Sequence, residues 1–355
     1  MQRYLNHWVW LGPLFAWIIL AADFLGSAPL ALVLLALAAS VTSAVHHAEV
    51  IAHRLGEPFG TLVLALAVTA IELGLILALM SGDAGSTLAR DTVIAAVMII
   101  LNGIVGTCLL IGGLRHREQA FQQSGVSAAL ATLSALTVLS LVLPNFTVSE
   151  PGPVYSDSQL AFVAVVSLLL YLTFIMVQTV RHREYFLPPK QATAHASDHG
   201  VLPTTRETAL SVAILIGALG AVVLLAKILS EPLGEMVESL GAPRAIVGVA
   251  IAALVLLPES VAAIRAALGN RVQTSLNLAL GSALATIGLT IPAVSALALI
   301  LGMPITLGLS GKGIVLLALT LLVATLSLGN GRTTILQGAV HLVIFGVYLF
   351  TTIVP

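Results

Sequence analysis

The chain has 355 residues, of which 58% are hydrophobic and only 9% are charged, and its formal net charge is -1. A soluble domain carries about 25% charged residues, so this composition excludes an ordinary soluble domain and predicts an integral membrane protein. The nearly neutral chain offers no basic face for nucleic acid, and its single cysteine, Cys108, excludes an internal disulfide and a cysteine metal cluster.

Long apolar segments recur along the whole chain. Because a transmembrane helix needs roughly 20 mostly apolar residues, we predict an all-α integral membrane protein with about eleven transmembrane helices. The first segment follows Arg3 and is interpreted as a retained span, since no small-residue cleavage site precedes a soluble domain. The predicted segments are 8–25, 28–45, 59–80, 92–113, 126–143, 159–180, 208–229, 245–265, 273–300, 313–328 and 333–353.

One long polar connection, residues 181–207, divides the chain and is expected to be a flexible linker. The positive-inside rule places the side with more Lys and Arg in the cytoplasm. This side holds the N-terminus and the linker, and because the number of predicted spans is odd, the C-terminus is expected on the outer side of the membrane. Its basic residues are Arg3, Arg54, Arg115, Arg117, Arg181, Arg183, Lys190, Arg206, Arg265, Arg271 and Arg332.

The two halves of the chain have the same arrangement of predicted helices. Glu72 and Glu259 each lie in the second helix of a group of five, and Tyr171 and Tyr348 lie in the last. Because each group has an odd number of helices, the second group enters the membrane in the opposite orientation to the first. We therefore predict two inverted five-helix repeats, which are typical of transporters. The predicted division is an extra N-terminal helix (1–27), a first repeat (28–180), the cytoplasmic linker (181–207) and a second repeat (208–355).

Glu72 is the only ionisable residue in the apolar stretch LALAVTAIELGLILALM, residues 64–80. A charged group near the middle of a span costs several kcal/mol unless it is paired, neutralised or hydrated, so such a residue is first interpreted as functional. Thr69 precedes Glu72 by three residues and shares its helix face. The alternative is a permanently protonated glutamate that makes an interhelical hydrogen bond.

Glu259 follows Pro258, which frees a backbone carbonyl in a membrane helix. A broken helix beside a carboxylate supplies both kinds of oxygen that a hard cation prefers. The alternative is a glutamate near the cytoplasmic end, salt-bridged or reaching the interface, because Arg265 follows six residues later.

Two carboxylates, one from each inverted half, could together neutralise a divalent cation. Without the cation they repel each other, so at least one pKa rises and protons are taken up. A site that binds either Ca²⁺ or protons is the physical basis of antiport. We therefore assign Glu72 and Glu259 as the residues that bind the cation and the protons in turn.

Neutral oxygens lie in the third helix of each predicted repeat. The possible neutral ligands, together with Thr69, are Asn102, Asn277, Ser282 and Thr286. Glycines accompany them, and small residues in membrane helices also mark tight helix packing. Packing is therefore an equally good interpretation of this polar set.

Histidines gather in two stretches, 46–53 and 195–199, whose roles the sequence leaves open. The first lacks the His-Glu-x-x-His zinc pattern and is expected to be an interfacial turn. His341 stands alone in a predicted span, and we expect it to make an interhelical hydrogen bond.

Several long motifs resemble the calcium/cation antiporter superfamily, and within it the bacterial ChaA-type calcium/proton exchangers. They are HRLGEPFGTLVLALAVTAIELGLILALM, LLPESVAAIRAALGNRVQTSLNLALGSALATIGLTIP, GGLRHREQAFQQSGVSAAL, SLLLYLTFIMVQT and GRTTILQGAVHLVIFGVYLF. The resemblance implies eleven helices, ten of them in two inverted repeats, and exchange of cytoplasmic cations for external protons. It places Glu72 and Glu259 at the two acidic cation-binding positions and Ser282 at a Gly-Ser position.

One departure concerns the residues before Glu72. Vacuolar relatives carry a Gly-Asn-x-x-Glu pattern, whereas Val68 and Thr69 stand at the Gly-Asn positions here. The prediction is therefore a cation/proton antiporter that works by alternating access, with Ca²⁺ and H⁺ as transported ions and Na⁺ or K⁺ as the alternative. We expect the protein to lie in the lipid bilayer and to have no cofactor, no nucleic-acid partner and no enzymatic activity. An intramembrane enzyme and a passive channel are the alternatives from other classes.

Overall fold

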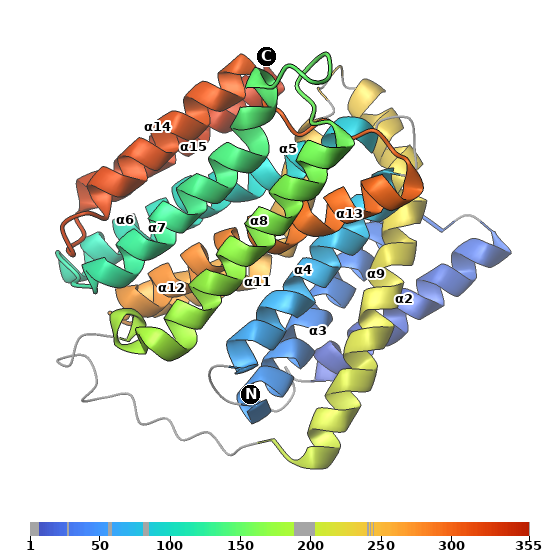
Figure 1. Ribbon diagram of the computed structural model, residues 1–355. Helices are drawn as coiled ribbons and strands as arrows, with labels where there is room; N and C mark the ends of the chain where they lie inside the picture. Colours follow the sequence, from blue (N-terminus) through green and yellow to red (C-terminus); the bar gives the residue numbers. More distant parts are fainter. Residues whose placement is uncertain are drawn as a thin grey trace. The chain divides into compact units, whose positions relative to one another are not determined.

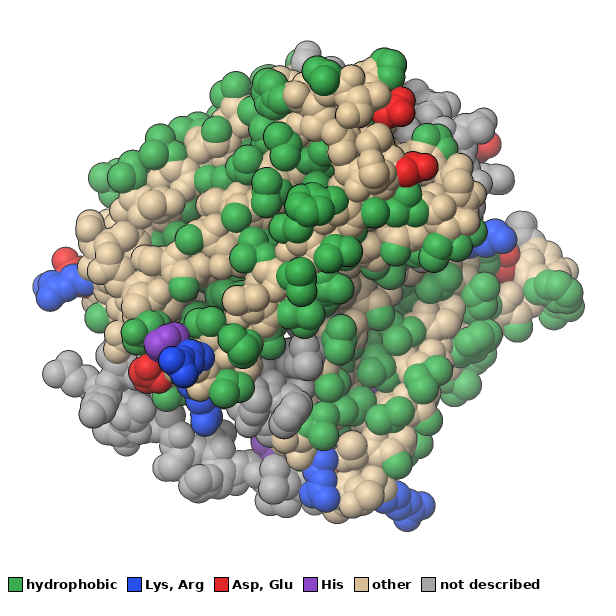
Figure 2. All heavy atoms as spheres, in the orientation of Figure 1, with side chains coloured by type: hydrophobic (Ala, Val, Ile, Leu, Met, Phe, Trp, Pro, Cys, Tyr) green, Lys and Arg blue, Asp and Glu red, His purple; other side chains and the backbone are tan. Residues whose placement is uncertain are grey.

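A computed structural model describes residues 7–26, 28–55, 59–80, 85–187, 203–239, 241, 243 and 245–354 (Figure 1). These residues are almost entirely helical, and their only β pairing is an isolated antiparallel bridge between Ala120 and Arg332. The face in Figure 2 carries many hydrophobic side chains and few charged ones, as a surface in contact with lipid requires. The all-α prediction is confirmed for the described residues.

Seven of the described helices are long and apolar enough to cross a membrane. The helices Ala245–Val255 and Leu257–Leu268 meet at a bend of 55° and make an eighth candidate if they form one span. Shorter apolar helices occur at Trp10–Leu25, Leu66–Ile76 and Gly311–Ser327. The chain is therefore an integral membrane protein by the length and composition of its helices, and the number of eleven spans stays a prediction.

The chain forms two compact units, and each unit joins two stretches that are far apart in the sequence. Unit 1 comprises Met1–Leu88 and Gly200–Pro258, and unit 2 comprises Ala89–His199 and Glu259–Pro355. Each unit thus draws helices from both predicted five-helix groups.

Unit 1 is built around helix α3, which packs against α2, α4 and α9, while α10 packs against α3, α4 and α9. Small residues permit these contacts: Ala44 and Ala218 are fully buried, and the Ser40 hydroxyl donates to the Ala218 carbonyl at 3.3 Å. Its helices are α2 (His7–Leu25), α3 (Leu30–Leu55), α4 (Phe59–Met80), α9 (Thr205–Ser239) and α10 (Ala245–Val255).

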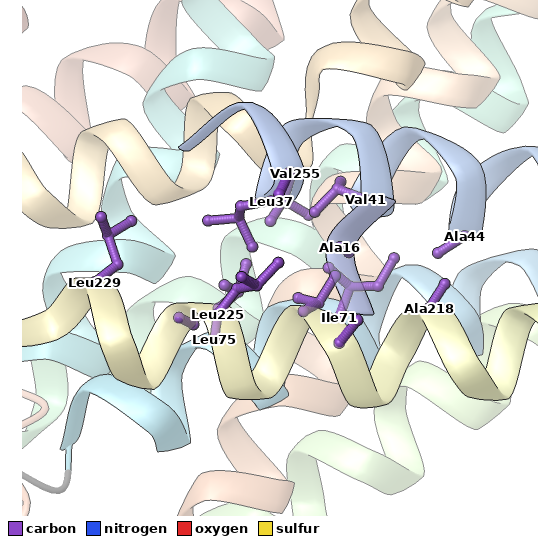
Figure 3. Close-up of a cluster of buried hydrophobic side chains, with 14 of the residues drawn as sticks. Ala16, Leu37, Val41, Ala44, Ile71, Leu75, Ala218, Leu225, Leu229 and Val255 are labelled. Carbon is purple, nitrogen blue, oxygen red and sulfur yellow. The ribbon is translucent and has the colours of Figure 1, made fainter. Parts of the chain in front are cut away.

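The core of unit 1 is aliphatic. In Figure 3, Leu37 of α3, Ile71 and Leu75 of α4 and Leu225 of α9 belong to one cluster of buried side chains. Lipid tails are as apolar as these residues, so close packing and interhelical hydrogen bonds hold such helices together.

Unit 2 contains the remaining helices, several of which pass through a π-helical turn. Its elements are α5 (Gly85–Met98, whose first residues fall in unit 1), η1 (Ile99–Ile104), α6 (Val105–His116), α7 (Gln123–Thr137), η2 (Val138–Val142), η3 (Leu143–Phe146), α8 (Asp157–Met176), η4 (Val177–Arg181), η5 (Arg183–Phe186), α11 (Leu257–Leu268), α12 (Val272–Ala285), η7 (Thr286–Thr290), α13 (Ile291–Leu301), α14 (Gly311–Ser327) and α15 (Ile335–Ile353).

Two helix pairs dominate the packing of unit 2. Helix α15 lies along α6 and η1, and α8 packs against α13 and η7 (Figure 1). At the first contact, a Cβ added to Gly338 would lie 2.4 Å from the Leu110 backbone nitrogen, so the two backbones approach too closely for any side chain there. The prediction that glycines in this part of the chain mark tight packing is confirmed at Gly106, where an added Cβ would lie 2.9 Å from the Cβ of His341.

Several predicted boundaries were wrong because helices extend into the polar flanks; α9, for example, was expected to end at 229 and continues to Ser239. Helix α3 was expected to end near residue 45 and instead continues to Leu55, since His47, Ala48 and Ile51 extend its buried face. The stretch 46–53 is therefore helical and not an interfacial turn.

Helix α9 likewise begins inside the predicted linker. Glu207 and Thr204 form a reciprocal cap, in which the Thr204 backbone N–H donates to Glu207 Oε2 at 2.7 Å and the Glu207 N–H donates to Thr204 Oγ1 at 3.2 Å. Most of the linker, residues 188–202 with the histidines at 195 and 199, lies outside the described residues.

Candidate functional site

Glu72 lies on α4 inside unit 1 and is only 3% exposed. Its neighbours along the helix, Ile71 and Leu75, belong to the aliphatic cluster of Figure 3, and Thr69, one turn earlier, is buried as well. A carboxylate in such surroundings is costly to hold as a charge unless it is paired, neutralised or hydrated. Glu72 and Thr69 are thus both buried in α4, and their role as ion ligands stays a prediction.

Glu259 lies immediately after the bend that separates α10 from α11. The Leu256 N–H still donates to the Ala252 carbonyl at 3.0 Å, but Pro258 has no N–H to continue the ladder. The predicted break beside this carboxylate is therefore confirmed, and Glu259 itself is half-buried. The chain passes from unit 1 to unit 2 between Pro258 and Glu259, so the two carboxylates belong to different units.

Two hydroxyl groups lie on α12 and η7, the helical segments that come after α11 in the chain. Ser282 on α12 has a buried Oγ that makes no hydrogen bond to the described residues. Thr286, one turn later and 3% exposed, begins the π-helix η7. π-Helical turns are rare and occur frequently at functional sites. The predicted role of Ser282 and Thr286 as neutral cation ligands stays a prediction.

The amides of Asn102 and Asn277 are engaged in hydrogen bonds within unit 2. Asn102 donates through Nδ2 to Thr320 Oγ1 at 2.9 Å and contacts His341 Nδ1 through Oδ1 at 3.1 Å. Asn277 donates to the Phe186 carbonyl at 2.6 Å and accepts from Gln273 at 2.9 Å. Both amides thus hold helices together in this structure, and their predicted role as cation ligands is not tested.

The histidine stretch at the end of α3 takes part in packing. His47 is fully buried, its Nδ1 lies 3.1 Å from Ser211 Oγ on α9, and the ring of Trp10 on α2 meets it edge-on with centroids 4.9 Å apart. No group of three His, Cys, Asp or Glu side chains among the described residues is arranged to hold a metal ion. The contacts of His47 therefore join three helices of unit 1.

A polar junction that the sequence did not predict fixes the end of α11. Gln119 donates through Nε2 to the Ala267 carbonyl and to Asn270 Oδ1, both at 3.0 Å. His116 lies 3.0 Å from the Leu268 carbonyl, and the Thr333 N–H donates to the Gln119 carbonyl at 3.0 Å. The helix that carries Glu259 is thereby anchored to unit 2 at its far end. These partners are about 150 to 214 residues apart, and no local pattern pairs them.

Comparison with known proteins gives consistent matches along the chain. Residues 25–180 and 210–354 match the family described as sodium/calcium exchanger protein. The putative ionic transporter y4hA of Sinorhizobium fredii is 49% identical over 98% of this chain and 96% of its own length. The sodium-potassium/proton antiporter ChaA of Escherichia coli is 37% identical over 90% of this chain and 87% of its own. A solved structure of the H⁺/Ca²⁺ exchanger CAX has a TM-score of 0.75 at 17% identity and covers 98% of this chain and 88% of that one.

Proposed function

Because this chain belongs to the sodium/calcium exchanger protein family, we propose that it is a cation/proton antiporter that exchanges Ca²⁺ for protons across the bacterial inner membrane. The family consists of transporters, so the chain is a membrane transport protein and not an enzyme. The observation that carries the proposal is the burial of Glu72, 3% exposed, in an apolar helix of unit 1. Such a carboxylate is retained where it can exchange one positive ligand for another.

In the proposed mechanism Glu72 and Glu259 bind the cation and the protons in turn. With a cation bound, both carboxylates are ionised and their charges are neutralised by the ion. After the cation leaves, the carboxylates take up protons, because unneutralised charges in a poorly solvated site are costly. The proposed neutral ligands are Thr69, Ser282 and Thr286. Asn102 and Asn277 are left out of this set because their amides hold helices together.

The proposed mechanism is alternating access, in which the cation- and proton-binding carboxylates are exposed to each side of the membrane in turn. Unit 1 holds the first two helices of the first predicted repeat and, from the second, α9 and α10; unit 2 holds the other helices, including α11 from residue 259 on. Within unit 2, the last helix of each predicted repeat packs against the third helix of the other: α8 on η7 and α13, and α15 on η1 and α6. This reciprocal packing supports two inverted five-helix repeats, and rocking between repeat-derived bundles is a common form of alternating access.

The proposed topology has eleven spans, with α2 as the extra first span and the N-terminus in the cytoplasm. It rests on the excess of Lys and Arg on the side of the linker. The C-terminus would then lie outside, and cysteines introduced at exposed positions near each end would react with an impermeant reagent from opposite sides. Reaction of both from the same side would contradict the odd number of spans.

A second candidate function is exchange of Na⁺ or K⁺ for protons. It is favoured by the 37% identity to a sodium-potassium/proton antiporter over 90% of this chain. Thr69 fits a monovalent cation as well as a divalent one, because a hydroxyl adds an oxygen ligand without adding negative charge.

Proton flux in sealed vesicles tests both candidates. An acid-inside gradient is challenged in turn with Ca²⁺, Na⁺ and K⁺ for the wild type, Glu72→Gln, Glu259→Gln and the control Glu150→Gln, whose side chain is exposed in a loop. We expect Ca²⁺ to dissipate the gradient in the wild type and the control, and neither glutamine variant of the site to respond. A response only to Na⁺ or K⁺ would favour the second candidate. Intact exchange in both site variants would refute the carboxylate mechanism.

A further inference from the structure

His341 on α15 is a titratable residue that the proposed carboxylate mechanism does not use. It is fully buried inside unit 2, and its Nδ1 lies 3.1 Å from Asn102 Oδ1 in the π-helical turn η1. Gly106, just beyond this turn, makes the contact possible, because an added Cβ would lie 2.9 Å from His341 Cβ. An imidazole is thereby held at the interface between two membrane helices.

The hydrogen bonds around Asn102 define which imidazole nitrogen carries the proton. Thr320 donates its hydroxyl hydrogen toward Met98 Sδ at 3.4 Å, so Thr320 Oγ1 accepts from Asn102 Nδ2 at 2.9 Å. The amide oxygen of Asn102 then faces the ring and can only accept. His341 therefore donates through Nδ1–H, and its Nε2 carries a lone pair.

This Nε2 atom is a buried base with no hydrogen-bond partner among the described residues. A neutral imidazole can satisfy one acceptor through Nδ1, whereas an imidazolium has two donors. The backbone carbonyl of Leu101, in the same turn as Asn102, also faces the imidazole and is a further acceptor. The surroundings of the ring therefore include oxygens that could stabilise a bound proton.

The helices that pack most extensively on α15 are α6, η1 and α14, and none of them carries an acidic side chain. Asp91 of α5 acts electrostatically on Tyr348 of α15, two turns from His341, and it is paired with Arg90 at 2.9 Å. A protonated His341 would thus be an uncompensated charge in the packed arrangement, and water would have to reach it. The titratable or charged residues of α6, α14 and α15 besides His341 are Cys108, Arg115, His116, Lys312 and Tyr348, and η1 has none.

We propose that His341 is a further proton-binding site of this antiporter, separate from Glu72 and Glu259. This inference rests on the proposed proton-coupled exchange. In the packed arrangement His341 is neutral, and it takes up a proton at Nε2 when α15 and η1 separate enough to admit water. Protonation then favours the separated arrangement, because returning the imidazolium to the packed interface requires removing its hydration. The site links the proton concentration to the packing of α15 on η1.

The test uses His341→Asn in the full-length protein. Asparagine can place its Nδ2 near the position of the imidazole Nδ1 and keep a donor for Asn102, but it has no titratable base. The matched control is His182→Asn, since His182 lies after η4 and is half-buried beside Tyr185. Two readouts are measured: ¹⁵N-histidine NMR spectra of the purified protein between about pH 8 and pH 5, and exchange rates in vesicles over the same range.

We expect one histidine signal, identified by its loss in His341→Asn, to be the Nδ1-protonated neutral form near pH 8 and to become imidazolium on acidification. We also expect the ratio of exchange rates at low and high pH to differ from wild type by about threefold or more in His341→Asn, and to be unchanged in His182→Asn. A signal that stays neutral down to about pH 5 would overturn the proposal. So would a pH profile that His341→Asn shares with the wild type.

The two proposals fail differently. The NMR titration reports on His341 whatever cation is transported. The carboxylate mechanism would be refuted by intact exchange in Glu72→Gln and Glu259→Gln. That measurement does not depend on the histidine signal.

Discussion

Tyr171 of α8 lies so close to Gly288 of η7 that a Cβ on the glycine would be 2.6 Å from Tyr171 Cβ and 2.7 Å from its Cγ. The position of Cβ is set by the α8 backbone, so this atom cannot rotate away as the end of a flexible side chain can. Tyr171 is 1% exposed, which leaves its ring no room to withdraw. The packing of α8 on α13 and η7 therefore depends on the absence of a side chain at position 288.

We expect Gly288→Ala to lower the free energy of unfolding by about 1–3 kcal/mol, because it overpacks a buried helix contact. Thermal unfolding of the protein in detergent measures the change. Gly281→Ala is the matched control, since an added Cβ there meets nothing within 4 Å and alanine favours a helix over glycine. Equal unfolding temperatures for the two variants would show that the contact with Tyr171 is not as close as described.

The Ser282 hydroxyl is expected to contribute to cation binding. Removing a neutral oxygen ligand in Ser282→Ala should raise the KM for the transported cation about tenfold, which corresponds to roughly 1.4 kcal/mol, with a smaller effect on the maximal rate. Initial rates of cation-dependent proton flux at varied cation concentration measure this. Ser295→Ala is the comparison, because Ser295 on α13 also has a buried Oγ without a hydrogen-bond partner among the described residues but lies outside the proposed site. A KM that rises equally in both variants would argue against a ligand role for Ser282.

The bond between Asn102 and Thr320 is expected to stabilise unit 2. Thr320→Val keeps the shape of the side chain but leaves Asn102 Nδ2 without its oxygen acceptor at 2.9 Å, and we expect unfolding to become easier by about 1–3 kcal/mol. Thr325→Val on the same helix is the control, because Thr325 is exposed and donates only to the Leu321 carbonyl of its own helix at 2.8 Å. Thermal unfolding that is the same in both variants would refute a structural role for this bond.

Glu72 could be located from the sequence because an apolar run of helix length predicts a transmembrane helix, and a carboxylate near its middle must lie inside the membrane. Its burial follows from its surroundings along the chain, and the structure places it at 3% exposure. The break at Pro258 was predictable for the same reason, since a missing N–H acts on the turn that contains it. The end of α3 was not, because packing against distant helices, as at His47 and Ser211, extended it beyond the apolar run.

The role of Asn102 could not be read from its neighbours in sequence. Its partners Thr320 and His341 are 218 and 239 residues away, and neither pairing leaves a periodic signal. Asn277 is similar, since it donates to the Phe186 carbonyl 91 residues earlier. Sequence reasoning could offer both amides only as possible ligands or packing groups.

By itself, the sequence determined that this chain is a helical membrane protein with a carboxylate inside an apolar span and a second carboxylate beside a proline break. These features follow from composition and from the 3.6-residue geometry of one helix, which are local properties. Only the tertiary structure decided that each compact unit combines helices from both halves of the chain, and that His341 meets Asn102. Those relationships depend on which helices can approach closely enough to pack and to share hydrogen bonds, and that choice is made in three dimensions.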